Sequence, residues 1–180
     1  GKAVAATREK RTAARGAGYV VESVQEELSL KKEIFRQLDA LCPPPAILAT
    51  NTSTIRPTVI AAAVDHPERV VVTHYFHPAH LVPLVEIVGG EQTSQETIAT
   101  VFRVLVTLRK KPVVMLKETA SFAGNRIQKG ISREASWLVE NGVCTPETVD
   151  TVITMGLGRR MGILGYFNRI DLGGLDLRGD

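Results

Sequence analysis

A histidine and a glutamate in the middle of the chain have the residue types and the surroundings of a proton-transfer pair. His74 follows closely on three consecutive valines, at the carboxyl end of an expected buried strand, which is where open α/β sheets place their ligand crevice. Glu86 interrupts the apolar run 84–88, so the two-residue period of a strand places its side chain away from bulk water. A buried carboxylate needs a partner, because unpaired burial of the charge is costly. The intervening loop lets the chain turn and bring the two side chains together.

This pairing is the arrangement of a general base. A carboxylate that holds one imidazole nitrogen fixes the tautomer and stabilises the imidazolium that forms on proton abstraction. Two structural alternatives stay open: His74 could bond a backbone carbonyl, and Glu86 could face solvent on an edge strand. We favour the pair because it explains both residues at once.

Three further groups of polar residues could take part. The run 51–54, Asn-Thr-Ser-Thr, follows an apolar segment and could hold a substrate oxygen, although turns and helix caps prefer the same residue types. Glu26 follows the first expected strand, where a cofactor ribose could be met, but it could equally be a solvated glutamate. Asn125 could reach back into the crevice or cap a helix. No set of histidine, cysteine and carboxylate residues has the spacing of a metal site.

The elements that must position these residues alternate between strand and helix. Strands are expected at 19–24, 46–50, 70–72, 83–88 and 112–116, with helices over 30–41, 57–64 and 93–109 between them. Such alternation predicts a mainly parallel sheet covered on both faces. Gly16 and Gly18 spell G-x-G but precede a strand, so we interpret them as a turn rather than a dinucleotide loop.

Capping residues mark several helix ends. Thr93 and Glu96 form a T-x-x-E capping box for the helix over 93–109. From Asn125 the pattern becomes helical as far as Gly142, and Thr145 caps a further helix. We therefore expect an α/β part over residues 1–118 and a helical part over 119–180.

Composition excludes several classes of protein. The 180 residues are 44% hydrophobic with a net charge of +3, and the basic residues lack the aromatic interleaving of a nucleic-acid surface. No apolar run approaches the roughly 20 residues of a membrane-spanning helix. Cys42 and Cys144 suit a reducing compartment, so a cytoplasmic protein is expected. The chain opens on Gly1 in what reads as the body of a helix, which suggests a fragment.

Four segments, in this order and spacing, carry a resemblance to a known family: AILATNTST, THYFHPAHLVPLVEIV, ASFAGNRI and DLGGLD. From Val20 to Asp176 the chain resembles the NAD-dependent L-3-hydroxyacyl-CoA dehydrogenases of fatty acid metabolism and their relatives acting on L-gulonate or carnitine. The resemblance implies a partial Rossmann-type NAD-binding domain in residues 1–118, followed by the start of an all-α domain in residues 119–180 that forms a homodimer. It also implies that both ends of the enzyme are missing.

The resemblance also assigns roles to particular residues. It places the general base on His74, its partner on Glu86, the groups that hold the substrate oxygen on Ser53 and Asn125, and the cofactor contacts on Glu26, Lys31 and Ser53. The implied reaction interconverts a 3-hydroxyacyl-CoA and a 3-oxoacyl-CoA with NAD. The alternative substrate is a small hydroxy acid.

The chain departs from the family pattern in three places. His77 stands where the family has an asparagine near the nicotinamide, so we include it among the cofactor contacts and expect altered cofactor fit or specificity. Residues 120–122, Ala-Ser-Phe, replace Pro-Gly-Phe at the domain junction. The glycine-rich strand, turn and helix that hold the pyrophosphate are absent. This last departure keeps open a hypothesis of another class, a catalytically silent structural or interaction protein.

Overall fold

The computed structural model describes residues 6–173, with side chains described to residue 172. The first five residues and the end of the DLGGLD motif lie outside the described part. The chain forms two compact units that divide between Arg126 and Ile127, inside one helix. The boundary expected at 118/119 stays a prediction.

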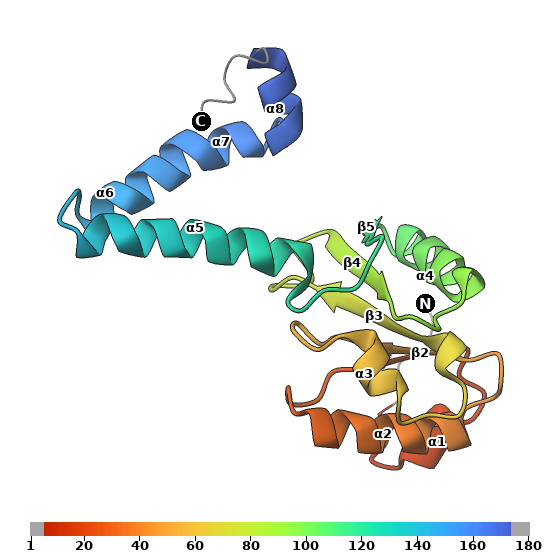
Figure 1. The fold of residues 1–180 in the computed structure, drawn as a ribbon. Coiled ribbons are helices and arrows are strands. Elements are labelled where there is room, and N and C mark those ends of the chain that lie inside the picture. Colours follow the sequence, from red (N-terminus) through yellow and green to blue (C-terminus); the bar gives the residue numbers. More distant parts are fainter. Residues whose placement is uncertain (1–5, 174–180) are drawn as a thin grey trace. The chain divides into compact units, whose positions relative to one another are not determined.

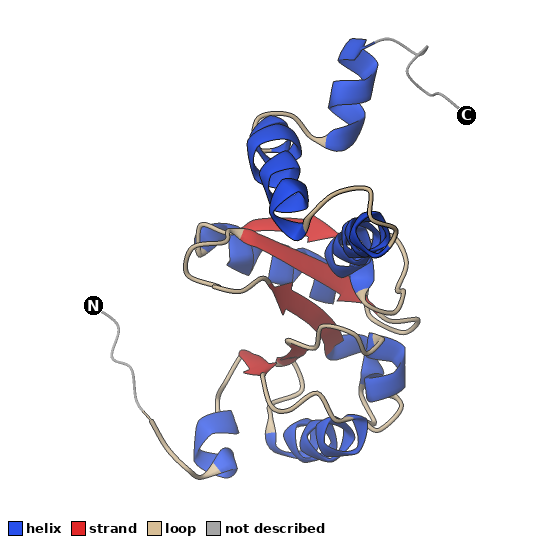
Figure 2. Cartoon of the chain, turned by 90° about the vertical axis from the view of Figure 1, so that its left-hand side faces the viewer, coloured by secondary structure: helices blue, strands red, loops and turns tan. Residues whose placement is uncertain are grey.

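The first unit is built on a five-stranded sheet whose strand order follows the chain (Figures 1 and 2). The strands are β1 (Tyr19–Glu22), β2 (Ile47–Thr50), β3 (Val70–Tyr75), β4 (Leu84–Gly89) and β5 (Lys111–Val114). All neighbouring strands are parallel except β3 and β4, which pair antiparallel. The mixed α/β fold with a mainly parallel sheet is thus confirmed.

Helices cover both faces of this sheet, as expected. They are α1 (Lys10–Ala14), α2 (Leu28–Leu41), α3 (Pro57–Ala61), the 3-10 helix η1 (Pro67–Arg69) and α4 (Gln95–Thr107). On one face, Leu48 and Val70 pack with Phe35 of α2. On the other, Val71 packs with Val101 of α4, because neighbouring residues of a strand point to opposite sides. Figure 1 shows α2 and α3 on one side of the sheet and α4 on the other.

The capping box predicted at Thr93 is wrong. The N-cap of α4 is Ser94, whose Oγ accepts from the Thr97 N–H at 3.0 Å. Thr93 instead donates its hydroxyl to the carbonyl of Val70 at 2.6 Å and accepts from the Gly90 N–H at 2.8 Å. A hydroxyl already used to join two strand ends is not available to a helix.

The second unit is helical. It takes most of α5 (Phe122–Glu140) and continues through α6 (Pro146–Thr151), the π-helical segment η2 (Val152–Leu157), α7 (Gly158–Met161) and α8 (Tyr166–Gly173). Thr145 caps α6 as predicted, accepting from the Thr148 N–H at 3.3 Å. Gly142, just beyond α5, has φ +68°, a conformation that glycine adopts without a steric penalty. None of the helices described here is long and apolar enough to cross a membrane.

Candidate active site

His74 and Glu86 face each other across the antiparallel pair of strands. The register of β3 and β4 places the two residues directly opposite, and His74 Nδ1 lies 2.8 Å from Glu86 Oε2. Their exposed fractions are 4% and 1%. The Nδ1–H therefore donates to the carboxylate, which leaves Nε2 as the nitrogen with a lone pair. Nε2 makes no hydrogen bond within residues 6–173, and it is not sealed from solvent.

The second oxygen of Glu86 is held by the first turn of α5. Glu86 Oε1 accepts from the N–H groups of Ala123 at 3.1 Å and Gly124 at 2.9 Å. The first N–H groups of a helix have no partner within it, and this end carries the positive part of the helix dipole. The carboxylate is therefore held from two sides, by the imidazole and by the first turn of the helix.

An unusual turn orients these two N–H groups towards Glu86. Ser121 and Phe122, the residues just before them, have φ +64° and +49°, a region that non-glycine residues rarely occupy. The Ser121 N–H donates to the carbonyl of Thr54 at 3.3 Å. The turn is thereby tied to the loop that follows β2.

Two aromatic rings enclose His74. The ring of Phe76 lies 4.7 Å from the imidazole and that of Phe122 lies 5.6 Å away, both tilted. Gly124 backs the Phe76 ring so closely that a Cβ on Gly124 would stand 2.3 Å from Phe76 Cζ. Sequence reasoning missed Gly124, whose only signal is a glycine inside a helix, where it is unfavourable.

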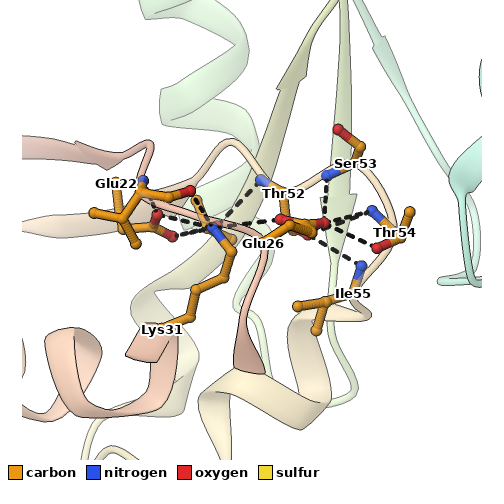
Figure 3. A network of polar contacts seen from close by, with 9 residues as sticks. Glu22, Glu26, Lys31, Thr52, Ser53, Thr54 and Ile55 are labelled. Atoms are coloured by element: carbon orange, nitrogen blue, oxygen red, sulfur yellow. Dashed lines mark hydrogen bonds and ion pairs between the residues drawn. The ribbon is translucent and has the colours of Figure 1, made fainter. Parts of the chain in front are cut away.

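A network of polar contacts holds the loop after β2 (Figure 3). Glu26 Oε1 accepts from the Ser53 N–H at 3.0 Å, from the Thr54 N–H at 3.0 Å and hydroxyl at 2.9 Å, and from the Thr52 hydroxyl. Partial burial raises the pKa of the Glu26 carboxyl, but these hydrogen bonds and the charge of Lys31 outweigh it and hold the pKa below its ordinary value.

Lys31 is almost fully buried, with an exposed fraction of 1%. Its Nζ lies 2.8 Å from Glu22 Oε1, 3.1 Å from Glu22 Oε2 and 3.5 Å from Glu26 Oε2. The ammonium expected to contact the cofactor is thus enclosed by two carboxylates. Glu22, the last residue of β1, is the buried partner of Lys31.

Ser53 and Asn125 lie together. Asn125 Nδ2 donates to the Ser53 carbonyl at 3.2 Å, and Asn125 is not an N-cap, because α5 begins three residues earlier at Phe122. The Ser53 hydroxyl makes no hydrogen bond within the described part of the chain. Asn51, by contrast, is used structurally, because its Oδ1 accepts from the Tyr75 N–H at 2.9 Å.

His77 lies outside this set of contacts. Its side chain is exposed, just beyond β3, and takes part in no hydrogen bond or ion pair among the residues that the structure describes. The same residues contain no group of three histidine, cysteine or carboxylate side chains that could hold a metal ion.

Comparison with protein families gives two adjacent matches. The model of the NAD binding domain of 3-hydroxyacyl-CoA dehydrogenase matches residues 2–119, and the model of the C-terminal domain of the same enzyme matches residues 122–178. Together they account for nearly all of the chain.

Among curated relatives, the chain is 43% identical over 152 residues to an L-carnitine dehydrogenase of Mesorhizobium japonicum, covering 84% of this chain and 42% of that protein. It is 36% identical over 165 residues to a 5-formyl-3-hydroxy-2-methylpyridine 4-carboxylate 5-dehydrogenase of the same organism, covering 92% and 53%. The chain thus spans about half the length of these relatives.

Solved structures agree with this likeness. The crystal structure of the 5-formyl-3-hydroxy-2-methylpyridine 4-carboxylic acid 5-dehydrogenase, described as an NAD+-dependent dismutase, matches with a TM-score of 0.92 at 36% identity, covering 95% of this chain and 55% of that one. A 3-hydroxyacyl-CoA dehydrogenase of Archaeoglobus fulgidus matches with a TM-score of 0.83 at 35% identity, covering 94% and 57%.

Proposed function

The chain belongs to the 3-hydroxyacyl-CoA dehydrogenase family of NAD-dependent oxidoreductases, and on this premise we propose that the protein oxidises the hydroxyl group of a small hydroxy acid, with His74 as general base. The carboxylate-held His74 with its free Nε2 carries this proposal. In the oxidising direction Nε2 takes the proton of the substrate hydroxyl. A hydride leaves the carbon that bears this hydroxyl, and that carbon becomes a carbonyl.

Glu86 prepares His74 for this step. Its carboxylate fixes the Nδ1–H tautomer and stabilises the imidazolium after the proton has arrived. The α5 N–H groups on Oε1 hold the carboxylate in place. The Ser53 hydroxyl supplies a hydrogen bond to the substrate oxygen.

The polar groups at this edge of the sheet fit NAD. The Ser53 hydroxyl is unengaged, and Glu26 Oε2, on a side chain 38% exposed, has only Lys31 as a neighbour within ion-pair distance among the described residues. Ser53 and Glu26 Oε2 would hold the nicotinamide ribose, and the exposed His77 just beyond β3 stays a sequence-based candidate for a further cofactor contact. When bound, NAD supplies the acceptor for the hydride.

The relatives support a small acid as the substrate. The L-carnitine dehydrogenase shares 43% identity, and the pyridine carboxylate dehydrogenase also acts, by its name, on a small acid. A 3-hydroxyacyl-CoA is the second candidate, favoured by the 35% identity to the Archaeoglobus enzyme. The ratio of kcat/KM for L-carnitine to that for 3-hydroxybutyryl-CoA distinguishes the two.

Replacing the base tests the proposed reaction itself. The substitution His74→Ala removes Nε2 and should lower kcat by about 100-fold or more, the usual contribution of a general base, while thermal unfolding shows that the fold remains. Near wild-type kcat in this variant would refute the proposed reaction. Failure of both this chain and a longer form of the protein to bind NAD in calorimetry would instead favour a silent interaction protein.

We also propose that the helical unit forms a homodimer. It contains a cavity of about 360 Å³ with an almost wholly apolar lining, which includes Ile131, Leu138 and Ile153. Exposed apolar cavities of this kind are typical of interaction sites. Light scattering should give twice the chain mass, and Ile131→Glu should give the mass of one chain.

A further inference from the structure

The loop that carries Ser53 is held from two sides, and we propose that Glu26 and Asn125 are positioning residues that fix the Ser53 hydroxyl for the substrate. In this assignment Glu26 acts mainly through the loop and only secondarily on the cofactor. The inference rests on the proposed function for the role of Ser53, whereas its structural part can be tested without any turnover.

We call the contacts that hold the Ser53 loop from its two sides the clamp, and Glu26 supplies the first side. Four donors from residues 52–54 converge on the single atom Oε1, two of them backbone N–H groups. Hydrogen bonds to an ionised acceptor are roughly twice as strong as neutral ones. Figure 3 shows Glu26 reaching across from the segment after β1 to these donors. Glu26, which follows β1, thereby determines the path of the loop that follows β2.

Buried charges fix Glu26 in turn. Lys31 Nζ, 3.5 Å from Glu26 Oε2, is itself held by both oxygens of Glu22 and by the carbonyl of Val24 at 3.4 Å. Glu22 Oε2 also accepts from the hydroxyl of Thr50, the last residue of β2, at 2.7 Å. This chain of contacts starts at the end of β2 and returns to the loop that follows β2. The carboxylate of Glu26 therefore has little freedom to move.

Asn125 supplies the second side. Its Nδ2 donates to the Ser53 carbonyl, while the Ser53 N–H donates to Glu26. Both polar backbone groups of Ser53 are thus engaged, and only the side-chain torsion is left to turn the hydroxyl. A hydroxyl held in this way is ready to bond a substrate oxygen without further ordering of the loop.

Amide hydrogen exchange tests the clamp directly on this chain. The substitution Glu26→Ala removes the acceptor, and Glu26→Gln keeps its size but removes the charge. We expect the Ser53 and Thr54 amides to exchange about 10-fold faster or more in Glu26→Ala, because each loses a hydrogen bond to a charged group. The matched control Glu33→Gln removes an exposed carboxylate of α2 that pairs with Arg36 at the surface, and should change neither amide. Unchanged exchange in Glu26→Ala would overturn the proposal.

Kinetics distinguish positioning from cofactor binding. A positioning role predicts that Glu26→Gln lowers kcat by about 10-fold or more, a larger factor than the rise in KM for NAD, because glutamine keeps an oxygen for the ribose while the loss of charge loosens the loop that presents Ser53 to the substrate. A rise in KM for NAD at unchanged kcat would overturn the positioning role and return Glu26 to the cofactor. If His74→Ala keeps its activity while the amide result holds, the proposed reaction fails and the clamp stands.

Discussion

Gly124 allows a sharp test of how the base is positioned, through the substitution Gly124→Ala. The added Cβ would stand 2.3 Å from Cζ and 2.9 Å from Cε1 of Phe76. Since carbon atoms in contact keep about 3.5 to 4.0 Å apart, the Phe76 ring must move by about 1 Å. That ring packs on the imidazole of His74, so the substitution should disturb the base as well as the core.

The expected change in unfolding free energy for Gly124→Ala follows from two opposing effects. Overpacking of this kind costs about 1 to 3 kcal/mol, whereas alanine in place of glycine inside a helix gains up to about 1 kcal/mol. Gly130, also in α5, provides the control, because within the described residues a Cβ placed there meets no atom within 4 Å apart from its chain neighbours and the nearby backbone of its own helix. Gly130→Ala should therefore show the gain alone. The difference in unfolding free energy between the two variants then isolates the steric effect, about 1 to 3 kcal/mol in favour of Gly130→Ala.

Two measurements carry this test. Thermal unfolding should place the Tm of Gly124→Ala roughly 2 to 12 °C below that of Gly130→Ala, at about 2 to 4 °C per kcal/mol for a chain of this size. Misplacing a catalytic group by about 1 Å can cost about 100-fold, so kcat should fall in Gly124→Ala and not in the control. If Gly124→Ala matches the control in both Tm and kcat, the close packing of Phe76 between Gly124 and His74 does not position the base.

Three further predictions concern the buried charges and a buried phenol. Glu86→Gln should lower kcat by about 10- to 100-fold and weaken the preference of His74 for the Nδ1–H tautomer, which the ¹⁵N chemical shifts of the imidazole report. An unchanged tautomer and kcat would contradict the role given to Glu86. Lys31→Met leaves Glu22 as an unpaired buried charge and should lower the unfolding free energy in urea titrations by about 3 to 5 kcal/mol. Adding Glu22→Gln should restore part of this stability. A loss below about 1 kcal/mol would contradict the buried pair. Burial raises the pKa of Tyr19 to about 12, against about 10 in the unfolded chain. The stability that Tyr19 contributes is therefore complete below about pH 10 and is lost as the pH rises towards 12, by up to about 2 to 3 kcal/mol. Tyr19→Phe should flatten this decline in the unfolding free energy, and an equal decline in both proteins would contradict the prediction.

The pairing of His74 with Glu86 could be anticipated because its signals are local. A carboxylate within an apolar strand has few ways of being satisfied, and a short loop limits which partner the turn can supply. The same reasoning applied to α2 was less successful. The helix expected over 30–41 is present, but its buried residues, Lys31, Phe35 and Leu38, include a lysine. Lys31 was expected to contact the cofactor, and its residue type gave no sign that it would be buried between two carboxylates.

The support for Glu86 from α5 had no such signal. It depends on the positive φ values of Ser121 and Phe122, and neither residue type indicates such a backbone. The donors are backbone N–H groups, which every residue but proline carries. The convergence of residues 52–54 on Glu26 is hidden for a similar reason, since most of the sequence between them forms α2 and β2. Such contacts emerge only when the sheet brings distant segments together.

The antiparallel pairing of β3 and β4 has a consequence for how such an enzyme can diversify. Both members of the proton-transfer pair lie on one continuous hairpin, held by the strand register, while the loop between the strands contributes neither of them. Lengthening a loop costs little, about 0.6 kcal/mol for each doubling of its length. Insertions and substitutions over residues 77–83, beyond the Phe76 ring that packs on the imidazole, can therefore change the loop while the base keeps its partner. The hairpin thus separates the strands that hold the proton-transfer pair from a loop whose length and sequence are free to vary.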